Sequence, residues 1–228
     1  MKKNLLFTSI GALIVVIGLG VYQWHQERRS NTNPRMTMPE QYQDYAVATF
    51  AGGCFWCTES DFEKTVGVVE AISGYTGGHT QNPTYKQTNT GTTGHREAVQ
   101  VFFDPEKVSY EQLLDVFWRH HDPTDGTGSF ADRGFQYSTA IFVHSEEQKQ
   151  IAQESKATLD ASGVFDEPVA TPILEAAEFF VAEDYHQDYH TKNPTRYGFY
   201  RNGSGRNDYI QEVWGDELKK AQELSLEK

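Results

Sequence analysis

Hydrophobic positions from about residue 45 onward follow two different periods. Short runs rich in β-branched and aromatic residues predict strands at 46–51, 68–75, 97–103, 137–144 and 168–175. Between these runs, apolar residues recur at helical spacing after residue 54, after Ser109 and after Ser145, and a short charged helix is predicted near Asp216. Ser109 and Gln112 have the spacing of a capping box. Strands that alternate with helices predict one mixed α+β domain, in which residues 183–215 are expected to be irregular.

The first 29 residues have a different character. The segment Leu5–Trp24 is apolar, and no charged residue lies between Lys3 and Glu27. About 20 helical residues span roughly the 30 Å of a bilayer's hydrocarbon core. We therefore expect one transmembrane helix that anchors the chain at 1–29, a tether at 30–45 and a folded domain at 46–228; a cleaved signal segment is the alternative.

The orientation of this segment depends on a narrow difference, because basic residues flank it equally on both sides. The very short leading part favours an amino end in the cytoplasm. The folded domain is then expected on the periplasmic or outer side of the inner membrane.

The net charge and the numbers of cysteines and histidines limit which partners and metal sites are expected. The sequence holds 20 Lys and Arg against 32 Asp and Glu, a net charge of -12, which argues against nucleic acid as a partner. Two cysteines are too few for a disulfide framework or a four-thiolate zinc site. His186 and His190 have i, i+4 spacing but lack the glutamate of a zinc-protease helix, so we expect them on a surface helix and expect no metal.

Both cysteines, Cys54 and Cys57, lie one helical turn apart directly after Gly52-Gly53. Unpaired N–H groups at a helix start stabilise negative charge, so we expect a lowered pKa for Cys54 and an exposed, nucleophilic thiol. Cys57 is close enough along the helix for a disulfide. Structural burial of both cysteines is the simpler alternative. Phe55 and Trp56 between them would give an aromatic wall for a small apolar group such as a methyl.

Two long stretches rich in Gly, Thr, Asn and Asp separate the predicted strands. The first carries Tyr85 and leads to Glu97, and the second carries Asp132 and leads to Tyr137. Long loops within a compact domain usually either build a site or are disordered. We therefore expect these two stretches, which also include His95, either to build a site or to be disordered.

Six short motifs in one order carry a resemblance to a known family. They are Gly53-Cys54-Phe55-Trp56, GYTGG at 74–78, NPTY at 82–85, TGHREAV at 93–99, the segment from Asp132 to Tyr137, and AEDYHQDYH at 182–190. Over roughly Thr49 to Pro194 the chain resembles the methionine sulfoxide reductase A family. The resemblance implies a single two-layer α/β sandwich with a ferredoxin-like core.

The resemblance also implies a reaction. Cys54 attacks the sulfur of a methionine S-sulfoxide, Glu97 protonates the oxygen, and the phenols of Tyr85 and Tyr137 assist. A sulfoxide oxygen leaves poorly until it is protonated, so the carboxyl must remain an acid near neutral pH. Alternation places Glu97 on one strand face with Val99, and burial of that face would raise the pKa of Glu97. Without the resemblance, an exposed glutamate at a strand end is the simpler interpretation.

The remaining implied roles concern binding and recycling. Asp132 binds the backbone N–H of the substrate methionine or orients a neighbour, and Phe55 and Trp56 hold its methyl. The tail at 200–209 lacks the recycling cysteines of many relatives, which leaves Cys57 to form a disulfide with Cys54. Electrons would come from thioredoxin or a similar dithiol donor, with no cofactor, and the substrates would be oxidised proteins and free methionine sulfoxide. We expect a monomeric catalytic domain. A membrane-anchored CxxC thiol–disulfide oxidoreductase is the alternative function.

Overall fold

The computed structural model describes residues 40–226, so the predicted membrane segment at 1–29 and most of the tether lie outside the described residues. Along the chain the elements are η1 (Glu40–Tyr42), β1 (Ala46–Ala51), α2 (Phe55–Glu63), β2 (Val68–Thr76), α3 (Tyr85–Thr88), β3 (Arg96–Phe103), α4 (Tyr110–Arg119), β4 (Gly128–Ser129), β5 (Asp132–Arg133), η2 (Phe135–Tyr137), β6 (Ala140–Val143), α5 (Glu146–Ala161), β7 (Ile173–Glu175), β8 (Phe179–Val181), α6 (Tyr189–Lys192), α7 (Pro194–Gly203) and α8 (Arg206–Leu226). Within residues 40–226 no helix is both long enough and apolar enough to cross a membrane.

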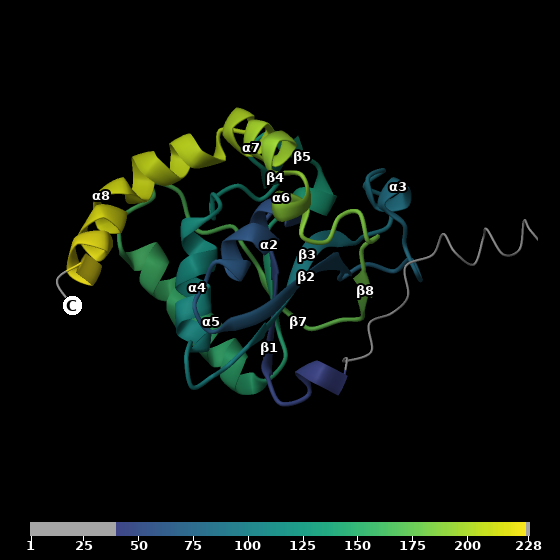
Figure 1. Ribbon diagram of the computed structural model, residues 1–228, viewed down its shortest axis with the longest axis horizontal. Helices are drawn as coiled ribbons and strands as arrows, with labels where there is room; N and C mark the ends of the chain where they lie inside the picture. Colours follow the sequence, from purple (N-terminus) through teal and green to yellow (C-terminus); the bar gives the residue numbers. More distant parts are fainter. Residues whose placement is uncertain (1–39, 227–228) are drawn as a thin grey trace, which may run out of the picture. The chain divides into compact units, whose positions relative to one another are not determined.

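Six strands form one sheet in the order β7-β6-β1-β3-β2-β8 (Figure 1). Every neighbouring pair is antiparallel except β6 and β7. The four central strands follow the order β6-β1-β3-β2, with α2 between β1 and β2 and α4 between β3 and β6. This is the connectivity of a split β-α-β-β-α-β unit, and it places the start of α2 beside the start of β3.

The main core lies between α2, α4 and one face of this sheet. Phe50 of β1 stacks on Phe62 of α2, with ring centroids 4.8 Å apart, and on Phe117 of α4 at 5.0 Å. Fully burying one such side chain contributes about 1.5–3 kcal/mol. The capping box is confirmed: Ser109 Oγ accepts from Gln112 N, and Gln112 Oε1 accepts from Ser109 N at 2.9 Å. The ring contacts of Phe50 fix α2, the helix that carries the cysteines, against β1.

Three predictions about secondary structure were wrong. Residues 168–175 form a strand only at Ile173–Glu175, because Pro168 and Pro172 cannot donate to a sheet ladder. The strand predicted at 137–144 is confined to Ala140–Val143, and η2 takes up its start. The carboxyl end, predicted to be irregular, is helical in α6, α7 and α8; Pro194 occupies the first turn of α7, where a missing N–H costs nothing.

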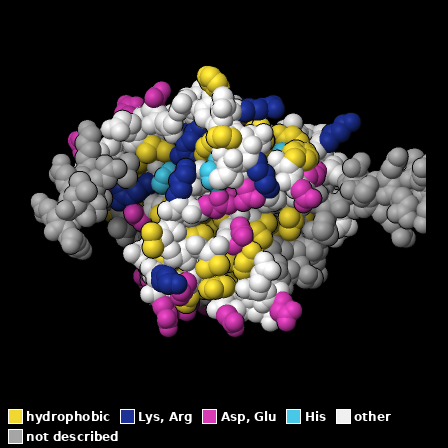
Figure 2. All heavy atoms as spheres, in the orientation of Figure 1, with side chains coloured by type: hydrophobic (Ala, Val, Ile, Leu, Met, Phe, Trp, Pro, Cys, Tyr) yellow, Lys and Arg dark blue, Asp and Glu magenta, His cyan; other side chains and the backbone are white. Residues whose placement is uncertain are grey.

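Most charged side chains lie on the outside of the domain, and a few, such as Glu59, Glu97 and Arg206, are buried. Figure 2 shows acidic groups near the centre of one face and along its lower edge, interspersed with Lys and Arg. Single apolar groups lie among them, as on most protein surfaces. The chemistry predicted from the sequence must therefore be sought inside the domain.

Candidate active site

One small pocket brings together residues from five separate parts of the chain. It is lined by Cys54, Phe55, Trp56, Tyr85, Glu97, Asp132, Tyr137 and Tyr200, and its volume is about 50 Å³. Seven of these residues were predicted from the sequence; the predicted Cys57 does not line the pocket, and Tyr200 was not predicted. The space admits a few atoms. A larger hollow of about 440 Å³, between α4, α5 and α8, contains neither cysteine.

The β1–α2 turn positions the first cysteine. Gly53 has φ +90°, and a Cβ there would collide with the side chain of Ser129. Glycine adopts this conformation without steric cost. The turn therefore delivers Cys54 as the N-cap of α2, with its side chain in the pocket.

Glu97 lies near the start of β3, on its apolar face, and is buried, with 3% of its surface exposed. Its Oε2 accepts a hydrogen bond from the Phe55 N–H at 3.0 Å. Burial raises the pKa of Glu97 well above the usual carboxyl range, as expected from the alternation along the strand, and the charges of Asp132 and Cys57 act in the same direction. Its surroundings thus favour the protonated form of the carboxyl group, the form that can donate a proton.

The expectation of an exposed, low-pKa Cys54 was wrong. Only 6% of its surface is exposed, and burial raises its pKa well above the ordinary thiol value, with further increases from Cys57 and Glu97. A hydrogen bond with Tyr200 opposes these effects. The N–H at the start of α2, which would stabilise a thiolate, is donated to Glu97 instead. Cys54 is therefore a thiol in the substrate-free pocket.

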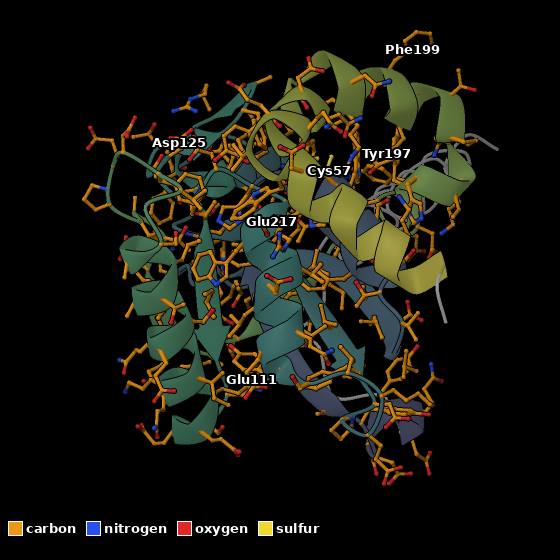
Figure 3. The ribbon with its side chains drawn as sticks, turned by 90° about the vertical axis from the view of Figure 1, so that its left-hand side faces the viewer. Cys57, Glu111, Asp125, Tyr197, Phe199 and Glu217 are labelled. Carbon is orange, nitrogen blue, oxygen red and sulfur yellow. The ribbon has the colours of Figure 1, made fainter. Side chains whose placement is uncertain are left out.

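Cys57 lies one turn further on and is fully buried among Trp56, Tyr189, Tyr197 and Tyr200 (Figure 3). A hydrogen bond from Cys54 and the nearby positive charges of two arginines lower the pKa of Cys57 to about 7, although burial acts in the opposite direction. Both thiols are reduced. The two thiols are therefore close neighbours that share one buried environment.

Two phenols face Glu97 across the pocket. Burial raises the pKa of Tyr85 to about 12 and raises that of Tyr137 further, so both remain neutral donors. The two hydroxyls hydrogen-bond each other, and Tyr137 Oη also donates to Asn89 Oδ1 at 3.0 Å. Neutral hydroxyl groups can hold an oxygen atom on which negative charge develops.

Tyr200 closes the pocket from α7. Its hydroxyl donates to Asp132 Oδ2 and also contacts Cys54, while burial raises the pKa of Asp132. Residues 200–209 lack cysteines, and their sequence pattern predicted no helix. The usable signal was the i, i+3 spacing of Tyr197 and Tyr200 after Pro194, which places both rings on one side of a helix.

The aromatic wall is built from α2 and the segment that leads into α6. Trp56 stacks on Tyr189 with centroids 3.7 Å apart, and its Nε1 donates to His186 Nδ1 at 3.0 Å. The ring of Phe55 lies 4.8 Å from that of His186. The prediction that His186 lies on a surface helix was wrong, since 1% of its surface is exposed. His186 instead holds the two aromatic residues in place.

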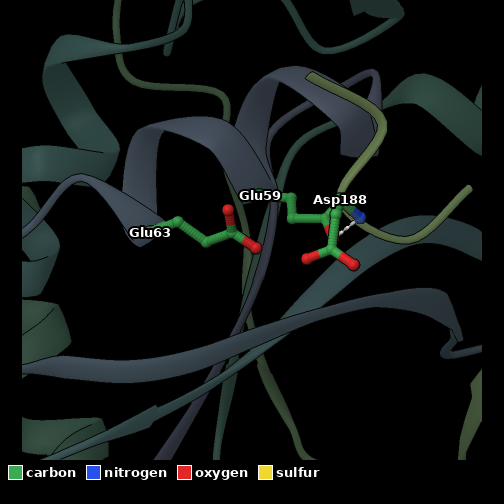
Figure 4. A group of neighbouring side chains, drawn as sticks. All are labelled: Glu59, Glu63 and Asp188. Carbon is green, nitrogen blue, oxygen red and sulfur yellow. Dashed lines mark hydrogen bonds between the residues drawn. The ribbon is translucent and has the colours of Figure 1, made fainter. Parts of the chain in front are cut away.

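Three carboxylates outside the pocket have oxygen atoms within 4.8 Å of one another: Glu59, Glu63 and Asp188 (Figure 4). Their oxygens already have partners. Glu59 accepts from Asp188 N at 2.8 Å and from Ser73 Oγ at 2.8 Å, and Asp188 pairs with Lys192. The cluster joins α2 to the start of α6, and we assign it no ligand.

A thiol in one pocket with a buried carboxyl group and two neutral phenols is typical of a thiol-dependent oxidoreductase. The family model for peptide methionine sulfoxide reductase matches residues 46–218. Peptide methionine sulfoxide reductase MsrA of Bacillus licheniformis is 56% identical over 74% of this chain and 93% of its own length. The MsrA of Bacillus subtilis is 53% identical over 74% of this chain and 96% of its own length.

Solved structures agree with the sequence comparison. Methionine sulfoxide reductase A of Corynebacterium diphtheriae superposes with a TM-score of 0.59 at 34% identity, covering 72% of this chain and 83% of that one. Reduced Mxr1 of Saccharomyces cerevisiae gives a TM-score of 0.60 at 32% identity, covering 66% and 86%. The chain belongs to the MsrA family of peptide methionine sulfoxide reductases, so its reaction is the reduction of methionine sulfoxide, and the thiol–disulfide oxidoreductase alternative is not favoured.

Proposed function

We propose that the chain reduces the S epimer of methionine sulfoxide, in proteins and as the free amino acid, with Cys54 as nucleophile. The observation that carries this assignment is the Cys54 thiol in one small pocket with Glu97, a carboxyl that burial keeps protonated. Cys54 sulfur attacks the sulfoxide sulfur while Glu97 protonates the oxygen. The products are methionine and a sulfenic acid on Cys54.

The rest of the pocket positions the sulfoxide. Tyr85 and Tyr137 donate hydrogen bonds to its oxygen, next to Glu97. Phe55 and Trp56 face the methyl group, and Asp132 accepts from the backbone N–H of the substrate methionine. The sulfoxide oxygen and the methyl group then contact different walls of the pocket. Only one configuration at sulfur allows both contacts while the sulfur faces Cys54.

Recycling of the sulfenic acid requires a second thiol. Cys57 is the other cysteine of the sequence and hydrogen-bonds Cys54, which supports a Cys54–Cys57 disulfide as the oxidised form. A thioredoxin-like dithiol then reduces this disulfide, and no further cofactor takes part. Peptide mapping after one turnover without reductant tests this step; a stable sulfenic acid or a dimer linked through Cys54 would contradict it.

We also propose that residues 1–29 anchor the domain to the inner membrane on its periplasmic or outer side. The uncharged run at 5–24 supports this proposal. A reporter that is active only outside the cytoplasm, fused after Glu40, tests it: an active fusion is expected, and an inactive one would place the domain in the cytoplasm.

The decisive assay follows reduction of a peptide methionine S-sulfoxide by the chain with dithiothreitol. Cys54→Ser is expected to abolish the reaction, and Glu97→Gln to slow it by about 10²–10⁴, because glutamine has no proton to donate. Glu147→Gln, an exposed substitution on α5, is the matched control. The R epimer should not react. Activity that survives in Cys54→Ser would refute the proposal.

A further inference from the structure

Tyr85 is positioned by a short helix rather than by the sheet. It is the first residue of α3, a helix of four residues that follows the long loop after β2. Figure 1 shows α3 at the edge of the domain, apart from the other helices in this view. So short a helix is not stable by itself and needs other contacts to hold it. The residues that fix α3 therefore determine where the phenol of Tyr85 lies in the pocket.

A hydrogen bond from another part of the chain holds each end of α3. At its start, the Tyr85 N–H donates to Glu183 Oε1 at 2.9 Å. At its end, the C-cap residue Asn89 accepts from Tyr137 Oη through its Oδ1 at 3.0 Å. Both phenols of the pocket therefore depend on the position of α3, because Tyr85 belongs to this helix and Tyr137 donates to its C-cap.

Glu183 connects the start of α3 to the sheet. It follows β8 and lies 98 residues after Tyr85 in the sequence. Its second oxygen, Oε2, accepts from Tyr75 Oη at 2.9 Å. Tyr75 lies on β2 and is fully buried, so packing in the core fixes the position of its hydroxyl. One carboxyl group therefore joins the backbone of α3 to a fixed hydroxyl of the sheet.

The same carboxyl group faces the histidine that supports the aromatic wall. His186 Nδ1 accepts from Trp56 Nε1, which can only donate, so the proton of the imidazole lies on Nε2. This Nε2 lies 4.0 Å from Glu183 Oε2, which is too far for a hydrogen bond but allows attraction between the N–H and the carboxyl oxygen. The ring of His186 also lies 4.6 Å from that of Tyr85. Glu183 therefore lies where the phenol wall and the aromatic wall meet.

We propose that Glu183 is a positioning residue of this site: it holds α3 so that the hydroxyls of Tyr85 and Tyr137 meet the sulfoxide oxygen when the methyl group lies against the aromatic wall. The proposal rests on the function proposed above. Glu183 does not line the pocket, so it acts through the phenols and not on the substrate. Its effect passes through the hydrogen bond from the Tyr85 N–H, and it therefore requires an acceptor at this place rather than a negative charge.

The first test measures methionine formed in the first turnover by the full-length chain. Glu183→Ala should lower the maximal rate constant about tenfold to a hundredfold, because small displacements of catalytic groups are costly, while the sulfoxide concentration at half the maximal rate should change less than about threefold. Glu183→Gln should stay within about threefold of the unmodified chain, since its Oε1 accepts from the same N–H and its Nε2 can donate to Tyr75 Oη. Asp184→Ala, an exposed neighbour, is the matched control and should change neither value.

A double-mutant cycle separates positioning from a general loss of structure. In a chain with Tyr85→Phe and Tyr137→Phe, no hydroxyl remains to be positioned, so Glu183→Ala should lower the rate constant by less than a further factor of about three. Glu183→Asp, which is shorter by one methylene, is the milder variant and should show a smaller loss with the same dependence on the phenols. An equal loss with and without the two hydroxyls, or a Glu183→Gln variant as slow as Glu183→Ala, would refute the proposal.

The second test follows amide hydrogen exchange of the reduced full-length chain without sulfoxide. Glu183→Ala should speed exchange in peptides that cover residues 84–89, because the Tyr85 N–H loses its acceptor, and should leave peptides of α5 unchanged. Unchanged exchange at 84–89 would overturn the proposal. Because this measurement uses no substrate, it distinguishes failure of this proposal from failure of the proposed function, which would appear as an unmodified chain that does not reduce the S-sulfoxide.

Discussion

Glu59→Gln should make the domain more stable at alkaline pH. Glu59 lies on α2 two residues after Cys57, with 1% of its surface exposed, and it accepts from the backbone N–H of Asp188 and from Ser73 Oγ. Glutamine can keep both bonds, since its Oε1 accepts from the same N–H and its Nε2 donates to the serine oxygen. The substitution therefore removes a charge and leaves the geometry in place.

The size of the effect follows from the pKa of Glu59. Burial raises it from 4.5 to about 8, against the two hydrogen bonds, and the charges of Glu63 and Asp188 add to the increase. One pKa unit corresponds to about 1.36 kcal/mol, so the raised pKa of Glu59 corresponds to at most about 5 kcal/mol in the free energy of unfolding. A carboxyl with a raised folded-state pKa stabilises the fold fully below about pH 4.5, and that stability is lost as the pH rises toward 8.

The assay compares the free energy of urea unfolding from pH 5 to pH 9, in a mild detergent and with EDTA so that no cation neutralises the carboxylates. Glu59→Gln should match the unmodified chain at pH 5 and exceed it by about 2–5 kcal/mol at pH 9. Glu147→Gln is the exposed control and should show no such difference. The first-turnover rate of Glu59→Gln at pH 9 should also fall less than that of the unmodified chain, because Glu59 connects α2 to the segment that carries His186.

A stability difference that is the same at every pH would refute the reasoning, because it would show that Glu59 is already charged in the folded protein at pH 5. A loss of stability in Glu59→Gln at pH 9 would also refute it, since it would mean that the carboxylate is favoured in its surroundings. Either result would remove the argument that the fold keeps a neutral carboxyl between α2 and α6.

Two further substitutions test the construction of the pocket. Gly53→Ala should lower the free energy of unfolding by about 1–3 kcal/mol and slow the first turnover, because alanine is strained at φ +90° and its Cβ meets Ser129. Gly198→Ala, where the space is open, should do neither. Equal effects of the two substitutions would refute the role of the turn. Tyr200→Phe should lower kcat/KM about tenfold, because it removes the hydroxyl that donates to Asp132 and contacts Cys54. An unchanged kcat/KM in steady-state kinetics would exclude Tyr200 from the site.

Periodic patterns made the sheet and its two covering helices predictable. Alternation along β3 placed Glu97 on one face with Val99, and the resemblance favoured burial of that face over an exposed strand end. The structure buries Glu97, and burial raises its pKa. A capping box fixed the start of α4. These features depend on local sequence and on the burial of one face, so they can be derived before the fold is known.

The acidity of the cysteines could not be derived in this way. Spacing after Gly52-Gly53 correctly placed Cys54 at a helix start, but the N–H there is donated to a carboxylate 42 residues away in the chain. A helix terminus favours a thiolate only when its N–H groups are free to reach the sulfur. Which partner takes them depends on the long-range pairing that brings β3 beside α2.

The carboxyl end shows how tertiary packing can reverse an inference from composition. Residues 200–209 lack cysteines, and from the sequence this stretch only removed a recycling route. In the structure it supplies Tyr200 to the pocket and brings Arg201 and Arg206 to Cys57. Its helical pattern is weak, and buried contacts of Tyr197 and Arg206 with earlier parts of the chain hold it in place. A stretch without cysteines therefore helps to enclose both thiols, because Tyr200 lines the pocket of Cys54 and packs in the cluster that buries Cys57.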